Sequence, residues 1–454
     1  MKKNDKDMEK SLKDSSLSEY AHAMRSSQWH CNFNTHLCME FLQEDDINNL
    51  YLNNFRISTY EKHIFCVSFE DFIASSGFKI VRAYVGDRDD VRPFEYENLE
   101  VGPKITKKVI NEGVLFLEHA ESKMRLIFTL EVYCPDMYEL SLQSRREHTE
   151  QAEKFLADLR AYAAKNNYLK NKKITPDFTF IELNTSYTWD SVVLDEKTKA
   201  KVRANIETLL GNIGIYEIND IPFKRGIILK GVPGVGKTLI GKILCNTAPC
   251  TVIWVTPRHL ERSKSVATIC DIARNLAPTI LFLEDIDLYG ASRDTNFNKT
   301  ILGELMNQLD GVTDNKNIIV IATTNRSNEL EKALRNRPGR FDSVIEIKAP
   351  AVGERERMLR LYTTKFVCDG VDFAELAKST DEYTGAHVKD LVNLAVMTAI
   401  EAGSYEKDSK KIILTQEHFD KNVKLVSKKK IGIGFNDVAG KKDDANRSIY
   451  DEDD

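Results

Sequence analysis

The sequence predicts an α/β fold, in which a parallel-sheet core with a C-terminal helical lid follows a small α+β domain. Three observations predict it. Short apolar runs alternate with helical patterns between residues 226 and 347, which is typical of βαβ units and a parallel sheet. A glycine-rich stretch follows the first of these runs and leads straight into a helical pattern. From residue 351 to about 427 the pattern is helical, so we expect helices there.

Length and composition limit the possible classes of protein. The 454 residues are enough for two or three domains with sizeable cores. The net charge of −5 gives no general attraction to nucleic acid or to anionic membranes. Eight scattered cysteines suit a reducing compartment better than a disulfide framework. The charged N-terminus does not resemble a signal peptide, and no segment approaches transmembrane length, so we expect a cytoplasmic protein without membrane attachment.

Residues 19–176 are predicted to form the α+β domain, after a polar start at residues 1–18 that we expect to be disordered. Strands are expected at Phe65–Phe72, Phe78–Val85, Val114–Glu118 and Arg125–Tyr133. One long helix is expected over Met137–Asn166, because an apolar stripe follows its second half: Ala152, Phe155, Leu156, Leu159 and Ala163. A linker is expected at Asn166–Asp177.

A cluster in the N-terminal part raises the alternative of a metal site. It consists of His30, Cys31, His36 and Cys38. The spacing is not a usual zinc pattern, and no second cluster completes it. We therefore favour core cysteines beside surface histidines.

The core is predicted over residues 177–350 and the helical lid over residues 351–427. Strands are expected at Phe178–Leu183, Gly226–Lys230, Thr251–Val255, Thr279–Leu283, Ile318–Ala322 and Val344–Ile347. Asp195 is expected to cap a helix that runs to Leu210. Lid helices are expected at Glu354–Phe366, Asp372–Lys378, Ala386–Ala402 and Gln416–Val426. Residues 428–454 end in an acidic run and are predicted to be a disordered tail.

The stretch Gly231–Thr238 has the spacing G-x-x-x-x-G-K-T between a predicted strand and a predicted helix. The glycines let backbone N–H groups point inward at phosphate oxygens. Lys237 adds a positive charge near the outer phosphates, and Thr238 offers a hydroxyl to Mg²⁺. The alternative is a glycine-rich turn with a chance lysine, but the full spacing in this context favours a P-loop.

Two carboxylates, Glu284 and Asp285, follow the apolar strand predicted at Thr279–Leu283. Ligands of open α/β sheets bind at the carboxyl ends of the strands. One carboxylate can hold Mg²⁺ through its water shell, and the next can polarise an attacking water. The alternative is a solvated loop, but the apolar strand and the upstream P-loop favour a catalytic pair.

Three further polar residues are weaker candidates. Asn325 follows another predicted strand and can orient a water through its amide. Arg337 and Arg340 lie around a turn, where arginines more often face solvent. In a ring-shaped assembly they would be candidates for fingers that reach a neighbour's γ-phosphate.

Taken in order, these motifs resemble those of the AAA ATPases. The resemblance is carried by the P-loop and by four further segments: Ile280–Asp287, Ile321–Arg326, Arg337–Asp342 and Tyr383–His387. It covers about residues 186–427, and Ile301–Gly311 also resembles the family's helix before sensor 1. Within the family, the motif sequences are most similar to those of the mitochondrial Rieske-protein translocase and related bacterial AAA ATPases.

The resemblance implies a role for each matched residue and the cofactors ATP and Mg²⁺. Glu284 and Asp285 would be Walker B, with Thr238 and Glu284 at the metal. Asn325 would be sensor 1, while Arg337 and Arg340 would be arginine fingers acting in trans. Residues near Val192–Leu194 would touch the adenine. The nucleotide-binding residues would be Gly231, Val232, Pro233, Gly234, Val235, Gly236, Lys237, Thr238, Leu239, Gly385 and Ala386.

The chain departs from the family's pattern at three places. Most members have Asp-Glu where this chain has Glu284-Asp285, which lengthens the metal arm and shortens the water-polarising arm. Tyr362 falls where many members have a histidine near the ribose. Residues 254–265 are shorter than the family's pore segment and lack its aromatic–glycine pair, which argues against threading of an unfolded chain.

The resemblance therefore implies an AAA ATPase that couples Mg-ATP hydrolysis to remodelling or disassembly of a protein partner. We expect a hexameric ring whose N-terminal domain chooses that partner. One alternative is a nucleotide-gated scaffold with little turnover. Another is a DNA-directed motor or loader, which the acidic charge balance disfavours.

Overall fold

The computed structural model describes residues 33–432 except 86–91, 94–95, 135, 183–186, 220, 222–223, 263–265, 289–303, 305–307, 309–316, 326–340, 342 and 407–408. The predicted disorder at residues 1–18, most of the predicted tail, and most of Ile301–Gly311 lie outside these residues. The chain forms two compact units. The first contains residues 1–184, 207–226 and 247–322, and the second contains the remainder.

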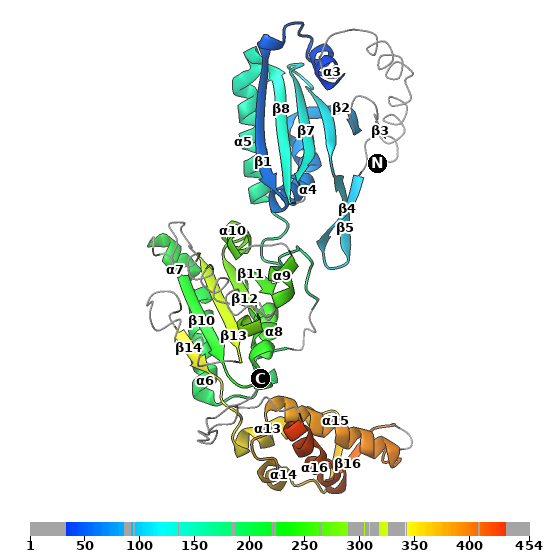
Figure 1. Cartoon of the computed structure of the whole chain (residues 1–454), viewed down its shortest axis with the longest axis vertical. Coiled ribbons are helices and arrows are strands. Elements are labelled where there is room, and N and C mark those ends of the chain that lie inside the picture. The colour runs from blue at the N-terminus through cyan, green and yellow to red at the C-terminus, as the bar shows by residue number, and fades with distance from the viewer. Residues whose placement is uncertain are drawn as a thin grey trace, which may run out of the picture. The chain divides into compact units, whose positions relative to one another are not determined.

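The N-terminal part of the first unit is built on an antiparallel sheet (Figure 1). Its described strands pair in the order β1-β8-β7-β6-β2-β3. They are β1 (Leu50–Ser58), β2 (Phe78–Val85), β3 (Arg92–Pro93), β6 (Gly113–His119), β7 (Arg125–Cys134) and β8 (Met137–Arg145). A separate hairpin pairs β4 (Tyr96–Gly102) with β5 (Ile105–Ile110). The expected strands at 78–85, 114–118 and 125–133 are confirmed.

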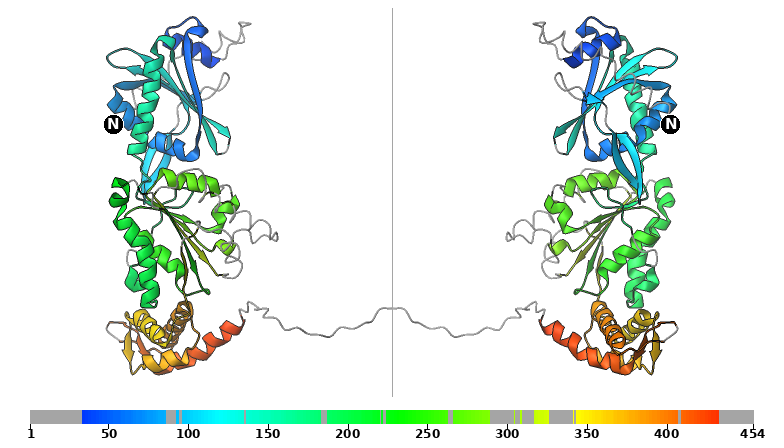
Figure 2. Two further views of the ribbon diagram at one scale, coloured as in Figure 1. Left: turned by 90° about the vertical axis from the view of Figure 1, so that its left-hand side faces the viewer. Right: turned by 90° about the vertical axis from the view of Figure 1, so that its right-hand side faces the viewer.

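Helices cover both faces of this sheet (Figure 2). On one face lies α5 (Thr149–Lys165), whose Arg160 guanidinium sits 4.2 Å from the Phe55 ring of β1. α4 (Thr59–Ser76) packs beside α5 through Phe72 and Phe155, whose rings are 5.3 Å apart. On the other face, α3 (Phe33–Leu42) packs Phe41 against Phe116.

Two expected elements of this part are wrong. The apolar run Phe65–Phe72 lies inside α4, because Ser58 and Glu61 form a capping box and Gly77, at φ +79°, ends the helix. A short apolar run fits a buried helix as well as a strand. The helix expected over Met137–Asn166 is divided, because residues 137–145 form β8 between β1 and β7. The predicted apolar stripe is buried on α5, as expected.

The expected linker at Asn166–Asp177 is instead packed structure. Residues Lys173–Ile174 form β9, which pairs in parallel with β11 (Thr251–Val255). Leu169 and Ile174 are fully buried, and the Phe178 ring lies 6.0 Å from that of Tyr60 on α4. The strand expected at 178–183 is reduced to an isolated bridge between Ile174 and Phe180. This short segment therefore joins the antiparallel part of the unit to the parallel sheet.

The predicted parallel sheet is confirmed. The described strands are in the order β14-β10-β13-β12-β11-β9, and the pairing is parallel for β10 with β14, for β11 with β9 and β12, and for β12 with β13. The further strands are β10 (Lys224–Lys230), β12 (Thr279–Leu283), β13 (Ile318–Thr324) and β14 (Ser343–Glu346). The described helices of this region are α6 (Glu196–Gly211), α7 (Ile213–Ile218), α8 (Lys237–Thr247), α9 (Pro257–Arg262) and α10 (Val266–Asn275). Asp195 accepts the Thr198 N–H at 2.9 Å, so its predicted cap is confirmed.

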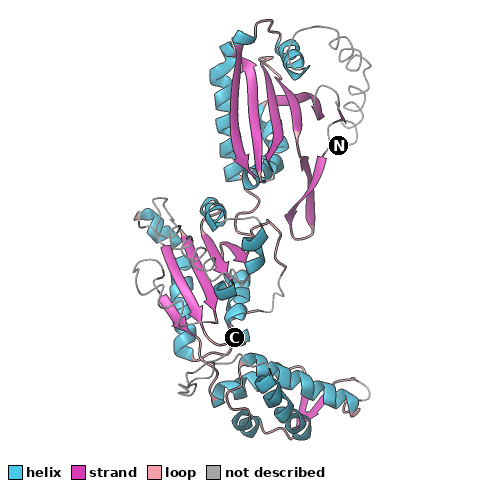
Figure 3. Cartoon of the chain, in the orientation of Figure 1, coloured by secondary structure: helices cyan, strands magenta, loops and turns pink. Residues whose placement is uncertain are grey.

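The C-terminal part of the second unit is mainly helical, as expected (Figure 3). It contains α13 (Val352–Thr363), α14 (Phe373–Ser379), α15 (Gly385–Glu401) and α16 (Gln416–Gly432). A parallel pair joins β15 (Val367–Asp369) to β16 (Ile413–Thr415). One apolar cluster, centred on the fully buried Leu359, Leu391 and Phe419, holds these helices together.

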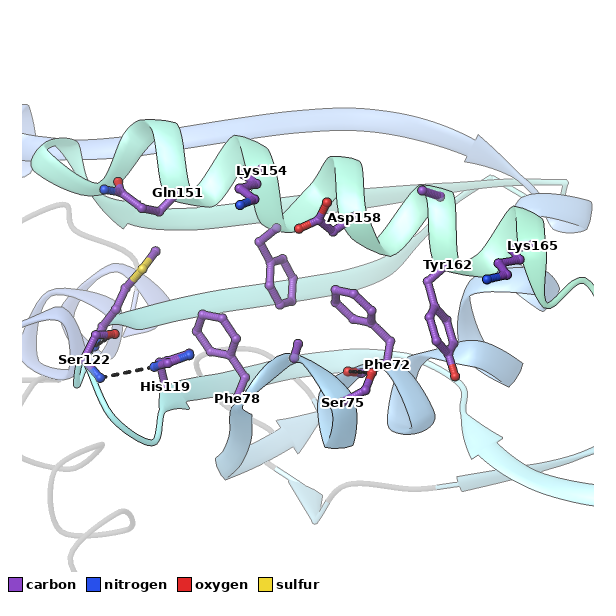
Figure 4. A pocket seen from close by; sticks show the side chains of 14 residues that line it. Phe72, Ser75, Phe78, His119, Ser122, Gln151, Lys154, Asp158, Tyr162 and Lys165 are labelled. Carbon is purple, nitrogen blue, oxygen red and sulfur yellow. Dashed lines mark hydrogen bonds between the residues drawn. The ribbon is translucent and has the colours of Figure 1, made fainter.

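A groove of about 640 Å³ opens in the N-terminal part between α5, α4 and β2 (Figure 4). Its floor is aromatic, because Phe72, Phe78, Phe155 and Tyr162 line it. Along α5 the rim carries Gln151, Lys154, Asp158 and Lys165, and Figure 4 shows them in a row above the rings. No helix in the described part of the chain is both long and apolar enough to cross a bilayer.

Candidate functional site

The glycine-rich loop joins β10 to α8, as the sequence predicts, and its geometry requires glycine at two places. A Cβ on Gly231 would stand 2.3 Å from the Ile347 carbonyl oxygen. Gly234 has φ +82°, and a Cβ there would stand 2.7 Å from both the Ala386 Cβ and the Thr384 Oγ1. The loop therefore has no side chain at these two positions, and its backbone can be approached closely. This fits a binding site for phosphate at the N-terminus of α8.

Lys237 is the first residue of α8, and it is only 5% exposed. Its Nζ donates to the carbonyl oxygens of Gly231 at 2.7 Å and Val232 at 3.0 Å. It also donates to Asn325 Oδ1 at 2.8 Å. The structure thus brings the P-loop lysine and the sensor 1 candidate together.

The lid helix α15 begins on the P-loop. The Ala386 N–H donates to the Gly234 carbonyl oxygen at 3.1 Å. At Gly385, a Cβ would lie 3.3 Å from the same oxygen. Both candidate lid residues, Gly385 and Ala386, therefore lie against the loop, and their small size is what permits this approach.

A cavity of about 170 Å³ lies beside the loop within the second unit. Its lining includes Val193, Leu194, Val235, Ile347, Pro350 and Met358. Val192 also belongs to this neighbourhood, since a Cβ on Gly236 would lie 3.4 Å from Val192 Cγ2. The segment expected to touch the adenine thus forms one wall of a cavity next to the glycine-rich loop, and Asp195, Lys348 and Glu354 also line this cavity.

The acidic pair follows β12 in the first unit, where Glu284 and Asp285 are both half-buried. The Glu284 N–H donates to the Val255 carbonyl oxygen at 2.9 Å, and its Oε2 accepts the Trp254 indole N–H at 3.0 Å. Asp285 has φ +47°, a left-handed conformation in which Asp is more common than most residues. This conformation gives a physical reason for the shorter acid at the second position.

Trp254 is a site residue that the sequence analysis did not single out. In the sequence pattern it marks only the start of a short pore segment. The available signal was a tryptophan one residue before the end of a buried strand. Without the register of β11 against β12, however, that signal does not identify Glu284 as the partner.

The remaining candidates do not all reach the site. Arg337 and Arg340 lie outside the described residues. Tyr362 packs against the lid core, and burial raises its pKa. Of the possible metal cluster, Cys38 is a core residue beside Leu37 and Phe116, and burial raises the pKa of its thiol to about 12.

His30 and Cys31 also lie outside the described residues. Within the part of the chain that the structure describes, no group of three or more His, Cys, Asp or Glu side chains is arranged to hold a metal ion. The seven described cysteines are free thiols.

Strand order, glycine-rich loop and lid define a P-loop nucleotide-binding module. The family model described as "ATPase family associated with various cellular activities (AAA)" matches residues 227–349. This part of the chain therefore matches the AAA family, in agreement with the expected family.

Relatives of known name support the same assignment. Proteasome-activating nucleotidase 1 of Halobacterium salinarum is 34% identical over 221 residues, which cover 46% of this chain and 54% of that protein. The 26S proteasome regulatory subunit 8 homolog of Saccharomyces cerevisiae is 34% identical over 256 residues, 53% of this chain and 61% of the relative. The ATP-dependent zinc metalloprotease FtsH of Mycoplasma mobile is 31% identical over 255 residues, 53% of this chain and 35% of that protein. The chain thus spans little more than half the length of the two proteasome-related proteins.

Proposed function

We propose that this protein hydrolyses Mg-ATP and uses the energy to remodel or disassemble a protein partner. The observation that carries the proposal is the contact between P-loop and lid, in which Ala386 donates to Gly234. Because the lid rests on the loop that cradles phosphate, phosphate binding and lid position are mechanically linked. A nucleotide cycle can therefore move the lid.

The described residues fit the parts that phosphoryl transfer requires. Backbone N–H groups of the P-loop and Lys237 would bind the phosphates, while Thr238 and Glu284 would hold Mg²⁺. Bound Mg²⁺ would neutralise charge that develops on the phosphate oxygens. Asp285 would polarise the attacking water, and Asn325 would orient it.

We further propose a homo-oligomeric ring, by analogy with hexameric AAA ATPases. Arg337 and Arg340 would complete the neighbour's site in such a ring. The domains would be the N-terminal domain at 19–176, the ATPase core at 177–350 and the lid at 351–427, in a cytoplasmic protein. Two of the relatives are named after the proteasome. On this basis we propose a protein as the class of substrate, and nothing more specific.

The N-terminal domain would select the partner through the groove beside α5. Its aromatic floor favours an apolar side chain, and Lys154 and Lys165 outnumber Asp158 on the rim. This charge balance favours a segment that carries a carboxylate next to the apolar residue. The variant Lys154→Glu/Lys165→Glu should lose partner binding while its ATP turnover is unchanged, and loss of both activities would count against this role.

Two alternative functions are separated by direct assays. A scaffold that binds ATP with little turnover would release phosphate no faster than the Lys237→Ala variant. The exchanged order of Glu284 and Asp285 is the feature that keeps this alternative open. A DNA-directed motor would bind DNA with a steep salt dependence, which the net charge of −5 disfavours.

The decisive experiment is a steady-state phosphate-release assay with the wild type and Lys237→Ala side by side. Turnover by the wild type that the variant abolishes supports the proposal. Equal and negligible release from both proteins would contradict it.

A further inference from the structure

Trp254 and Glu284 lie on neighbouring parallel strands and meet at their carboxyl ends. In the register of β11 against β12, Trp254 is opposite Phe282, two residues before Glu284. The Trp254 ring packs on Phe282 with centroids 4.5 Å apart, and Trp254 is only 9% exposed. From this buried position its Nε1 donates to Glu284 Oε2 at 3.0 Å.

The chemistry of the two groups makes this bond specific. An indole N–H can only donate, so it recognises a carboxylate oxygen and has no acceptor to offer in return. A hydrogen bond to an ionised carboxylate is stronger than one between neutral groups. The bond uses Oε2, one of the two oxygens of the Glu284 carboxylate.

The length of the glutamate explains why a positioning group is useful here. Glu has one more rotatable bond than Asp, so its carboxylate can take up more orientations. A donor that hydrogen-bonds to a ligating side chain and fixes its orientation commonly supports metal affinity. The buried Trp254 ring, packed on Phe282, supplies such a donor at a fixed place.

We propose that Trp254 is a positioning residue, whose indole N–H holds the Glu284 carboxylate in the orientation that receives the water shell of Mg²⁺. The inference rests on the proposed role of Glu284 at the metal. A purely structural Trp254 would contribute packing alone, and the two roles predict different results when only the N–H is removed.

The test uses Trp254→Phe in the full chain, which keeps an aromatic ring and removes the donor. The Mg²⁺ concentration that half-saturates binding of a fluorescent ATP analogue should rise about tenfold, as expected for one lost bond to a charged group. The packing control is Phe282→Leu, which disturbs the same ring contact but keeps the indole N–H. It should lower the melting temperature without this shift in Mg²⁺ dependence.

A double-mutant cycle identifies the partner of the indole. Glu284→Asp shortens the arm, so the carboxylate no longer reaches Trp254 in the same way. In that background Trp254→Phe should change the Mg²⁺ dependence less than twofold. Equal, multiplicative effects of the two changes would mean that they act independently, and would overturn the inference.

A spectroscopic readout requires no metal. The chain has three tryptophans, so the indole signal of Trp254 can be assigned in a ¹⁵N-tryptophan spectrum by elimination, with the variants Trp29→Phe and Trp189→Phe. In Glu284→Gln that signal should move to lower proton frequency, because the acceptor loses its charge. An unmoved signal would overturn the inference even if Trp254→Phe failed to fold.

Failure of the proposed function gives a different result. If the wild type showed no Mg²⁺-dependent nucleotide binding, the role of Glu284 itself would be wrong. If the wild type bound with clear Mg²⁺ dependence and folded Trp254→Phe bound identically, only the role of Trp254 would be refuted.

Discussion

The contact between the lid and the P-loop makes Gly234→Ala an informative perturbation. The added Cβ would stand 2.7 Å from Ala386 Cβ, about 1 Å inside the ~3.5–4.0 Å separation that carbon atoms prefer. The backbone at Gly234 also has φ +82°, where a side chain costs roughly 1–2 kcal/mol. A shift of the lid by that distance would break the 3.1 Å bond from Ala386 N to Gly234 O, worth about 0.5–1.5 kcal/mol.

A matched control separates the backbone strain from the contact with the lid. Gly403 has φ +67°, but a Cβ there would meet nothing within 4 Å. Backbone strain alone should therefore lower the free energy of unfolding of Gly403→Ala by roughly 1–2 kcal/mol. Its nucleotide affinity should be unchanged. Gly234→Ala should lose about 1 kcal/mol more stability and bind ATP at least tenfold more weakly.

The assay is chemical denaturation of each variant beside a titration with a fluorescent ATP analogue. A second variant, Gly234→Ala/Ala386→Gly, removes one of the two clashing groups and should recover part of the affinity. The reasoning would be refuted if Gly234→Ala bound nucleotide as well as Gly403→Ala does, since the lid would then not constrain the loop.

Three further predictions concern the chemistry and the assembly. Lys237→Ala should abolish tight ATP binding, since it removes the charge at the outer phosphates, and an unchanged affinity in a titration would refute the P-loop role. Asp285→Asn should bind Mg-ATP but hydrolyse it far more slowly, because an amide cannot polarise water as a carboxylate does. If Glu284→Gln instead slowed hydrolysis while Asp285→Asn lost its Mg²⁺ dependence, the two carboxylates would have the opposite roles. Mixing Arg340→Ala subunits with Lys237→Ala subunits should restore some phosphate release. The reason is that an arginine finger raises the rate by about 10³ or more, but only when a neighbouring subunit supplies it. No recovery of phosphate release would argue against a ring.

The ATPase core could be predicted from the sequence because its signals are local. A short apolar run specifies a strand, and the strands expected at Thr251–Val255 and Thr279–Leu283 match the structure residue for residue. The order of the motifs then indicates which ends meet. What local pattern cannot supply is the pairing of strands that are distant in the chain.

Two of the errors in the N-terminal part, at β8 and β9, have this cause. Residues 137–145 have no strong alternation, and they form β8 because β1 and β7 lie on either side. The two-residue strand β9 exists only because β11 offers an edge, and a polar stretch of that length resembles a linker. The bond between Trp254 and Glu284 depends on strand register in the same way.

The position of β9 also determines how the N-terminal domain is best removed for a functional test. A cut at residue 180 would delete Ile174, which is fully buried beside β11, whereas a cut at residue 166 keeps this edge strand. We expect the chain 166–454 to retain ATP turnover and to lose partner remodelling. Loss of turnover as well would mean that the N-terminal part supports the core itself.

The same truncated chain tests whether this protein threads polypeptides. The segment after β11 folds into α9, Pro257–Arg262, and the sequence from Thr256 to Lys264 offers Leu260 as its only large apolar side chain. Leu260 is half-buried, and even full burial of such a side chain against a substrate stabilises by only about 1.5–3 kcal/mol. Each subunit should therefore grip an unfolded chain weakly. We expect neither the full chain nor residues 166–454 to unfold a tagged fluorescent protein, while the full chain still dissociates its own partner. Robust loss of fluorescence with the truncated chain would show that this short segment grips substrate, and that the N-terminal domain is not needed for the work.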